Sequence, residues 1–178
     1  MGGAVTLQSV WNHPVRLAEL SRGPVALDLV AGEAQRAEIA RLLNLPEIKR
    51  LEARLRLRPW LDGAELTGSL RAEIVQESGV SLELFDTVVE APVEGQFLPA
   101  GSPNAPDPAA ELDLDPEAPD PPYVLEGEVL DLAVLVVEQL ALSIDPFPRM
   151  PGETFDYQSP EGDDSPFAVL KRLKENER

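Results

Sequence analysis

The chain has 178 residues, 43% of them hydrophobic, with no cysteine, one histidine and a formal net charge of −17. The lack of cysteine excludes disulfides, zinc–thiolate sites, iron–sulfur clusters and a cysteine nucleophile. Because the negative charge repels phosphate, broad electrostatic attraction is excluded as the main mode of binding to nucleic acid. The apolar content is enough for a hydrophobic core, and no apolar run is long and uncharged enough to span a bilayer.

Two features of charge and composition divide the chain. Residues 1–60 carry nine basic and six acidic side chains, whereas residues 61–178 carry six basic and 26 acidic ones. Residues 99–122 contain eight prolines and six acidic residues, and no basic residue. We expect this stretch to be a flexible acidic loop within one domain formed by residues 1–98 and 123–150, with a flexible tail over 151–178. The loop either holds a basic partner, such as a ribosomal protein, or is a solubilising spacer.

The first half of the chain predicts a helix and two strands. Residues 15–20 fit a short strand or one helical turn, and residues 24–30 predict a strand. Apolar residues spaced three and four apart predict a helix near 32–44. Residues 49–58 alternate with a period of two, which predicts a half-buried strand. Its apolar face holds Leu51, Ala53, Leu55 and Leu57.

The next segments predict an antiparallel meander. Asp62 and Gly63 indicate a hairpin turn. A strand is expected over 65–75, with a possible bulge at Gly68. Another is expected over 80–89, and a fourth ends near residues 97–98. In the strand over 80–89, the predicted apolar face holds Val80, Leu82 and Leu84.

Two further helices are expected in the second half. Residues 128–143 are apolar on most sides, which predicts a long buried helix that ends before Pro146. Residues 165–175 predict a short terminal helix, with Ser165 as the N-cap and Pro166 in its first turn. The expected fold is therefore a single α+β domain. Its curved antiparallel sheet, a meander or a barrel-like form, packs against the long helix and the shorter helix of the N-terminal half.

A basic strand face is the first candidate site. Arg50, Arg54, Arg56 and Arg58 would project together from the strand over 49–58, and guanidinium groups fit phosphate oxygens. They are therefore candidate RNA or anion contacts. The alternative is that they pair with carboxylates of neighbouring strands, for which Glu65, Glu73 and Glu83 are the candidates.

The remaining polar clusters predict no chemistry. The carboxylates at 113, 115 and 117 and at 163–164 lie in proline-rich segments, where no rigid cleft is expected for catalysis or metal binding. His13 is expected to be a bystander with no catalytic role. Trp11 and Trp60 are expected to pack in the core or at its rim, and the alternative for Trp60, which follows the basic strand, is that it stacks on a base. We expect no cofactor, no metal, no small-molecule substrate and no membrane partner. Because the N-terminus lacks a secretory pattern, the cytoplasm is the expected compartment.

Several motifs together resemble the YceD family of bacterial proteins, with an alphaproteobacterial-like pattern. They are AEIVQ at 72–76, VSLE at 80–83, EVLDL at 128–132, VEQLAL at 137–142, DPFPR at 145–149 and SPFAVLK at 165–171. Many relatives carry cysteines near residues 76–79. This chain has none there, so no redox or metal role carries over.

The resemblance implies a non-enzymatic factor that supports accumulation of large-subunit ribosomal RNA and assembly of the large ribosomal subunit. It would act by binding a ribosomal protein, precursor ribosomal RNA, or both, and it has no family catalytic residues. The terminal motif either docks a partner or folds back onto the core; its candidate docking residues are Pro166, Phe167, Leu170, Lys171 and Lys174. Two other functions stay open, a generic acidic adaptor that docks partners through this motif and an acid–base hydrolase with two acidic side chains.

Overall fold

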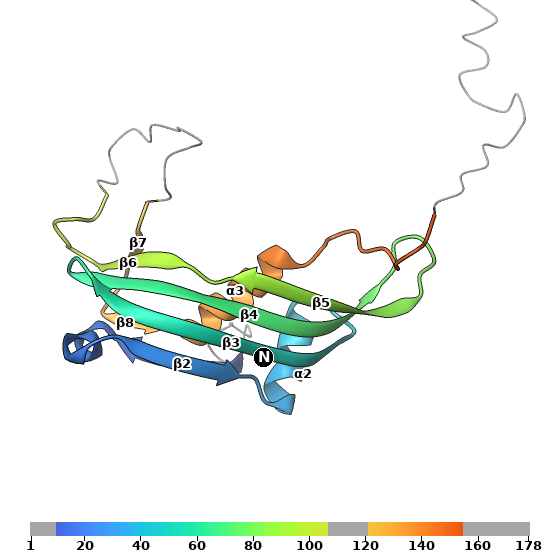
Figure 1. The fold of residues 1–178 in the computed structure, drawn as a ribbon, viewed down its shortest axis with the longest axis horizontal. Coiled ribbons are helices and arrows are strands. Elements are labelled where there is room, and N and C mark those ends of the chain that lie inside the picture. The colour runs from blue at the N-terminus through green and yellow to red at the C-terminus, as the bar shows by residue number, and fades with distance from the viewer. Residues whose placement is uncertain (1–9, 107–120, 155–178) are drawn as a thin grey trace, which may run out of the picture.

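The computed structural model describes residues 10–106 and 121–154, and it confirms the expected α+β fold (Figure 1). Eight strands, two α-helices and one 3-10 helix make up this part of the chain. In chain order they are β1 (Pro14–Arg16), η1 (Leu17–Arg22), β2 (Val25–Val30), α2 (Glu33–Leu42), β3 (Glu47–Trp60), β4 (Gly63–Glu77), β5 (Leu84–Pro92), β6 (Gly95–Pro99), β7 (Tyr123–Leu125), β8 (Val129–Asp131) and α3 (Leu132–Ser143).

The main sheet is open and has six strands. Its order is β2-β3-β4-β6-β7, and β5 pairs with β4 beside β6. The predicted β3–β4 hairpin is present, but its turn lies at Leu61 and Asp62, one residue before the predicted Asp62-Gly63, because Gly63 already pairs with Trp60. Leu61 takes a left-handed φ of 51°. Because β2 and β7 lie at opposite ends of the strand order and do not pair with each other, the sheet does not close, and the barrel-like alternative is wrong. The sheet is also not wholly antiparallel, because β6 and β7 pair in parallel after the excursion that starts at residue 100.

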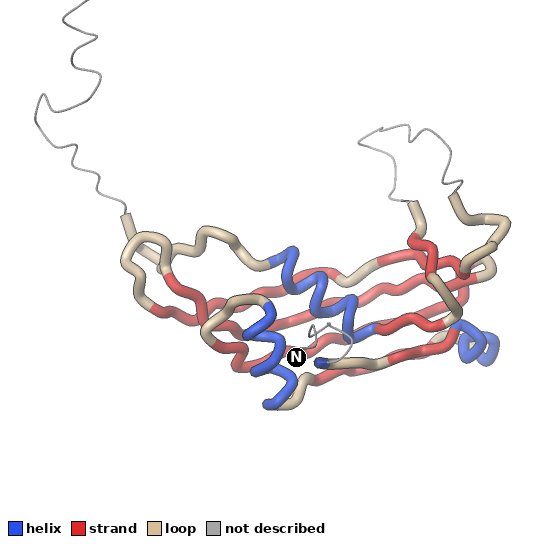
Figure 2. Tube along the Cα trace, turned by 180° about the vertical axis from the view of Figure 1, so that it is seen from behind, coloured by secondary structure: helices blue, strands red, loops and turns tan. Residues whose placement is uncertain are grey.

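Both helices lie on one face of this sheet (Figure 2). The small β1–β8 sheet lies on the same side, and apolar residues of β3, β4 and α3 form one cluster between the layers. We call the side that carries the helices the inner face and the opposite side the outer face. Among the described residues no element covers the outer face, so its side chains are available to solvent and partners.

Helix α3 is shorter than expected, and only one side of it is buried. Residues 129–131 form β8 because they pair with β1, and the helix begins at Leu132 after the Asp131 N-cap. Leu132, Val136 and Leu140 are fully buried, whereas Leu142 is 82% exposed. The helix therefore packs along one layer and is not an internal rod surrounded by strands.

The strand expected over 80–89 was predicted in the wrong phase. Residues 80–83 lie in the β4–β5 connection, where Leu82 has a φ of 62° and is 71% exposed. In β5, Leu84 faces solvent, and the buried positions are Val89 and Ala91. The apolar pattern of 80–84 runs through a turn and ends at the exposed first residue of β5, so it does not mark a core face.

The predicted bulge at Gly68 is also absent from the β3–β4 ladder. Gly68 pairs in regular register with Leu55, and the register shift lies between Ile48 and Arg50. Gly68 is required for another reason: an ideal Cβ there would lie 2.2 Å from the main-chain oxygen of Arg54. The shift near Ile48 leaves both Lys49 and Arg50 exposed on β3.

Candidate functional site on the outer sheet face

Strand β3 places the predicted basic residues on the outer face. Its apolar positions from Leu51 to Leu57 are buried, and the residues between them point away from the helices. Neighbouring strands add further charges to this face, so that cations and carboxylates intermix. The cations are Lys49, Arg50, Arg54, Arg56, Arg58 and Arg71, and the carboxylates are Asp28, Glu47, Glu52, Glu65, Glu73, Glu77, Asp86 and Glu90.

Carboxylates pair with most of these cations. Arg58 pairs with Glu65, its direct neighbour on β4, as the sequence suggested. The Arg50 guanidinium lies 2.8 Å from the Glu52 carboxylate of its own strand, an interaction not predicted from the sequence. Glu73 faces Arg50 across the β3–β4 ladder, but among the described residues its ion pair is with Arg71 of its own strand, at 3.9 Å.

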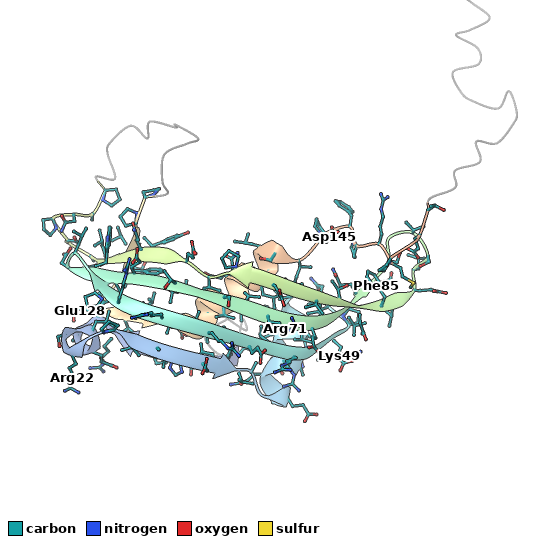
Figure 3. All side chains as sticks on the ribbon, viewed as in Figure 1. Arg22, Lys49, Arg71, Phe85, Glu128 and Asp145 are labelled. Atoms are coloured by element: carbon teal, nitrogen blue, oxygen red, sulfur yellow. The ribbon has the colours of Figure 1, made fainter. Side chains whose placement is uncertain are left out.

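The same pattern continues toward β5. Arg71 pairs with Glu90, and the Lys49 ammonium lies 2.6 Å from the Asp86 carboxylate. Figure 3 shows Lys49 and Arg71 on the sheet face opposite the helices. The outer face thus carries ion pairs within and between strands, and these pairs engage Arg50 and Arg58 of the four predicted arginines.

Pairing changes the protonation equilibria of some of these groups. The hydrogen bond from Arg58 lowers the pKa of Glu65, and the same bond raises the pKa of Arg58. The hydrogen bond to Asp86 raises the pKa of Lys49. Each shift favours the charged form, so these groups stay ionised near neutral pH.

Arg54 and Arg56 are the least engaged arginines of the face. Arg54 lies 4.0 Å from Asp28, and both side chains are more than 80% exposed. Arg56 has no ion pair or hydrogen bond within residues 10–106 and 121–154. These two residues therefore keep the guanidinium groups that a ligand can reach.

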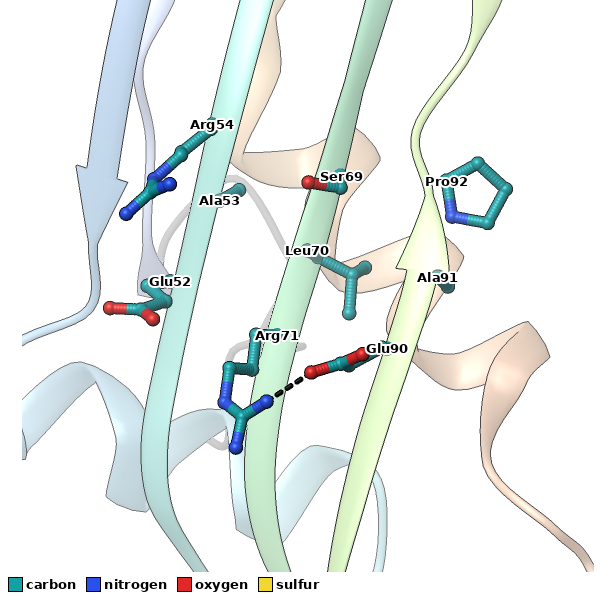
Figure 4. Close-up of a pocket in the computed structure, with 9 residues that line it drawn as sticks. All are labelled: Glu52, Ala53, Arg54, Ser69, Leu70, Arg71, Glu90, Ala91 and Pro92. Carbon is teal, nitrogen blue, oxygen red and sulfur yellow. Dashed lines mark hydrogen bonds and ion pairs between the residues drawn. The ribbon is translucent and has the colours of Figure 1, made fainter.

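Two open depressions adjoin Arg54. One, of about 470 Å³, lies over β3, β4 and β5, and includes Ser69 and the Arg71–Glu90 pair (Figure 4). The other, of about 360 Å³, lies over β2, β3 and β4 and includes Arg56 and Thr67. Guanidinium and hydroxyl groups together can bind a single anionic group. The nearby carboxylates repel a longer polyanion. This face is therefore better suited to bind a partner whose surface carries both positive and negative charges.

The predicted C-terminal docking residues Pro166, Phe167, Leu170, Lys171 and Lys174 lie outside the described residues, as does the helix expected over 165–175. The central part of the acidic loop, residues 107–120, lies outside them too.

The described beginning of the acidic loop is held against the β3–β4 turn, because Ser102 and Asn104 donate hydrogen bonds to Asp62. These bonds lower the pKa of Asp62, with the bond from Asn104 contributing most.

A second surface was not predicted from the sequence. A depression of about 610 Å³ lies between β7, β8 and α3, and Tyr123, Val124 and Val129 on its border are all about half exposed or more. Tyr123 stacks on Phe97 with the ring centres 5.5 Å apart. The signal available in the sequence was the pair of short apolar runs at 123–125 and 129–130.

The described residues contain no group of three or more side chains suited to hold a metal ion. Within the same ranges, no helix is long and apolar enough to cross a membrane. No family model matches the chain, and comparisons with curated proteins and with solved structures found no significant similarity.

Proposed function

We propose that this protein is a non-enzymatic binding factor that supports accumulation of large-subunit ribosomal RNA and assembly of the large ribosomal subunit in the cytoplasm. Its partner is a ribosomal protein of the large subunit, precursor ribosomal RNA, or both. The family resemblance of the motifs at 72–83, 128–149 and 165–171 supports the biological process. The pairing pattern of the outer face supports the ranking of partners.

A basic ribosomal protein is the favoured direct partner. Residues 61–178 hold 26 acidic and only six basic side chains, so their surfaces attract cationic proteins. Four of the six cations on the outer face already contact carboxylates within 4.0 Å, not counting the long Arg54–Asp28 approach. This pairing is the observation that carries the ranking, because paired arginines are poor ligands for an RNA backbone.

Arg54 and Arg56 are the residues that would contact RNA. These side chains keep accessible guanidinium groups beside the Thr67 and Ser69 hydroxyls. A contact through two arginines neutralises about two phosphates, which implies a shallow dependence of affinity on salt.

The test measures binding of the full chain to purified large-subunit proteins and to precursor ribosomal RNA across a salt series. We expect a large-subunit protein to bind with higher affinity than the RNA. The double variant Arg54→Ala/Arg56→Ala should weaken RNA binding and leave binding of the large-subunit protein unchanged, and Arg149→Ala is the matched control for loss of an exposed cation.

Tight RNA binding with a steep salt dependence that the double variant abolishes would reverse the ranking of partners. The absence of binding to either ligand class would reject the proposed function itself.

A further inference from the structure

Strand β2 leaves one edge of the main sheet open. It pairs with β3 over six residues without a bulge, and none of the described segments pairs with its other side. In Figure 1, β2 forms the border of the sheet, with η1 before it and α2 after it. An unpaired strand edge exposes main-chain donors and acceptors that can pair with another chain.

The register shows which main-chain groups point outward. The Ala31 N–H donates to the Leu51 oxygen at 3.0 Å, so the odd-numbered residues of β2 form the hydrogen-bonded pairs with β3. In an antiparallel ladder the intervening residues direct their N–H and C=O groups to the other side. Ala26, Asp28 and Val30 therefore present these groups at the open edge.

The other border of the sheet is protected. Strand β5 carries Asp86 and Glu90 and ends in Pro92, and β7 is only three residues long. Charged residues, proline and short strands are the usual means of blocking edge pairing. Strand β2 has one carboxylate and no lysine or proline, and its Val30 is 65% exposed. It is the sheet edge best suited to accept another strand.

We propose that two copies of this chain associate by antiparallel pairing of their β2 strands about a two-fold axis at Leu27. In this register Ala26 of each copy opposes Asp28 of the other, and both residues have outward main-chain groups. The paired strands would join the two sheets into one continuous sheet, which is a self-complementary contact between identical surfaces.

Charge favours the register with the axis at Leu27 over the register with the axis at Asp28. A shift of the axis to position 28 would place the two Asp28 carboxylates directly opposite each other, and like charges so placed are destabilising. With the axis at Leu27, Asp28 faces Ala26 of the second copy, which in turn neighbours Arg56 on β3. The long Arg56 side chain crosses the small Ala26 to reach Asp28, across two strand spacings of about 10 Å. This gives the arginine without a described partner an ion pair between the copies.

Sedimentation equilibrium of the full chain tests the contact, from about 10 μM to about 500 μM, because small interfaces give weak association. We expect a monomer–dimer equilibrium. Ala26→Pro should weaken it at least about tenfold, since proline removes an outward donor without removing one that pairs with β3. Sedimentation as a monomer over the whole range would overturn the proposal.

Two substitutions test the register. Asp28→Ala and Arg56→Ala should each weaken the dimer about tenfold, because each removes two symmetric ion pairs. The double variant should be no weaker than either single one. Independent effects that multiply would contradict the ion pair, and Arg149→Ala serves as the control for loss of an exposed cation.

Hydrogen exchange gives a readout on the unmodified chain and does not depend on how any variant folds. The amides of Ala26, Asp28 and Val30 should gain protection as the protein concentration rises, while those of Leu27 and Leu29 stay protected throughout. Protection of the outward amides that does not change with concentration would overturn the contact between copies.

Discussion

The Asp131 carboxylate accepts a hydrogen bond from the main-chain N–H of His13, 118 residues earlier in the chain, at 2.9 Å. The same oxygen accepts from the N–H groups of Ala133 and Val134 at the start of α3. The Leu132 N–H in turn donates to the His13 oxygen at 3.1 Å. One side chain therefore caps the helix and joins it to the N-terminal strand.

Asp131→Ala should lower the free energy of unfolding by about 2 kcal/mol. The loss combines an N-cap with a half-buried His13 N–H left without its acceptor. Asp131→Asn keeps an acceptor oxygen and should lose less. Urea denaturation followed by circular dichroism measures both, with Glu138→Ala, exposed on the same helix, as the control. Equal stability of the Asp131→Ala variant and the native chain would contradict the role of this cap.

Gly68 should not tolerate a side chain. Because its Cβ would approach the Arg54 oxygen to 2.2 Å and Leu55 to 2.8 Å, Gly68→Ala should destabilise the sheet by about 1–3 kcal/mol. At Gly127 nothing lies within 4 Å of an added Cβ, so Gly127→Ala is the matched control. Thermal denaturation of the two variants distinguishes close packing at Gly68 from a general effect of losing glycine. Equal melting temperatures of the Gly68→Ala and Gly127→Ala variants would refute the close packing at Gly68.

The exposed and buried sides of α3 should respond differently to truncation. Leu140 is fully buried and Leu142 is 82% exposed. Leu140→Ala should cost about 2–5 kcal/mol through lost burial and a cavity, whereas Leu142→Ala should stay within about 0.5 kcal/mol of the native chain. Denaturant midpoints measure both. A large loss of stability in the Leu142→Ala variant would indicate that the helix is covered on the side that faces away from the sheet.

The segment after α3 should loosen in acid. The hydroxyl of the buried Ser78 donates to the Glu153 carboxylate, which lowers the Glu153 pKa below its usual value of 4.5, and the Met150 N–H bonds to the same group. A lowered folded-state pKa means that this stabilisation is complete above the ordinary pKa and is lost as pH falls through the folded value.

Glu153→Gln should therefore flatten the dependence of stability on pH below about 4.5. Urea midpoints of the native chain and the variant, compared from neutral pH down to acid, measure the change. Glu138→Gln serves as the control for loss of an exposed carboxylate. Parallel curves for the native chain and the Glu153 variant would show that this carboxylate does not stabilise the segment.

The predicted faces of β3 agree with the structure, because a period of two is a local property of an extended chain. The positions from Leu51 to Leu57 alternate cleanly, and each buried side chain packs on the helix side. The same reasoning failed for residues 80–84. There the chain turns around the Ser78 hydroxyl, which accepts bonds from the Val80 and Ser81 N–H groups, and periodicity carries no information about a turn.

The sequence predicted the positions of the candidate site residues, but only one of their ion-pair partners. The sequence placed the four arginines on one strand face, and it named Glu65 correctly as a partner of Arg58. It could not assign Asp28 to Arg54, since that proximity depends on the register between β2 and β3.

The sequence by itself determined the alternation of β3, the β3–β4 turn, the helical character of α3 and the separation of charge between the two halves of the chain. These properties follow from neighbouring residues. The tertiary structure alone decided that β8 precedes α3, that the sheet stays open and that Arg56 is left without a described partner. Each of these outcomes depends on which distant strands meet and in what register, and the free energy of that choice comes from contacts between segments far apart in the chain.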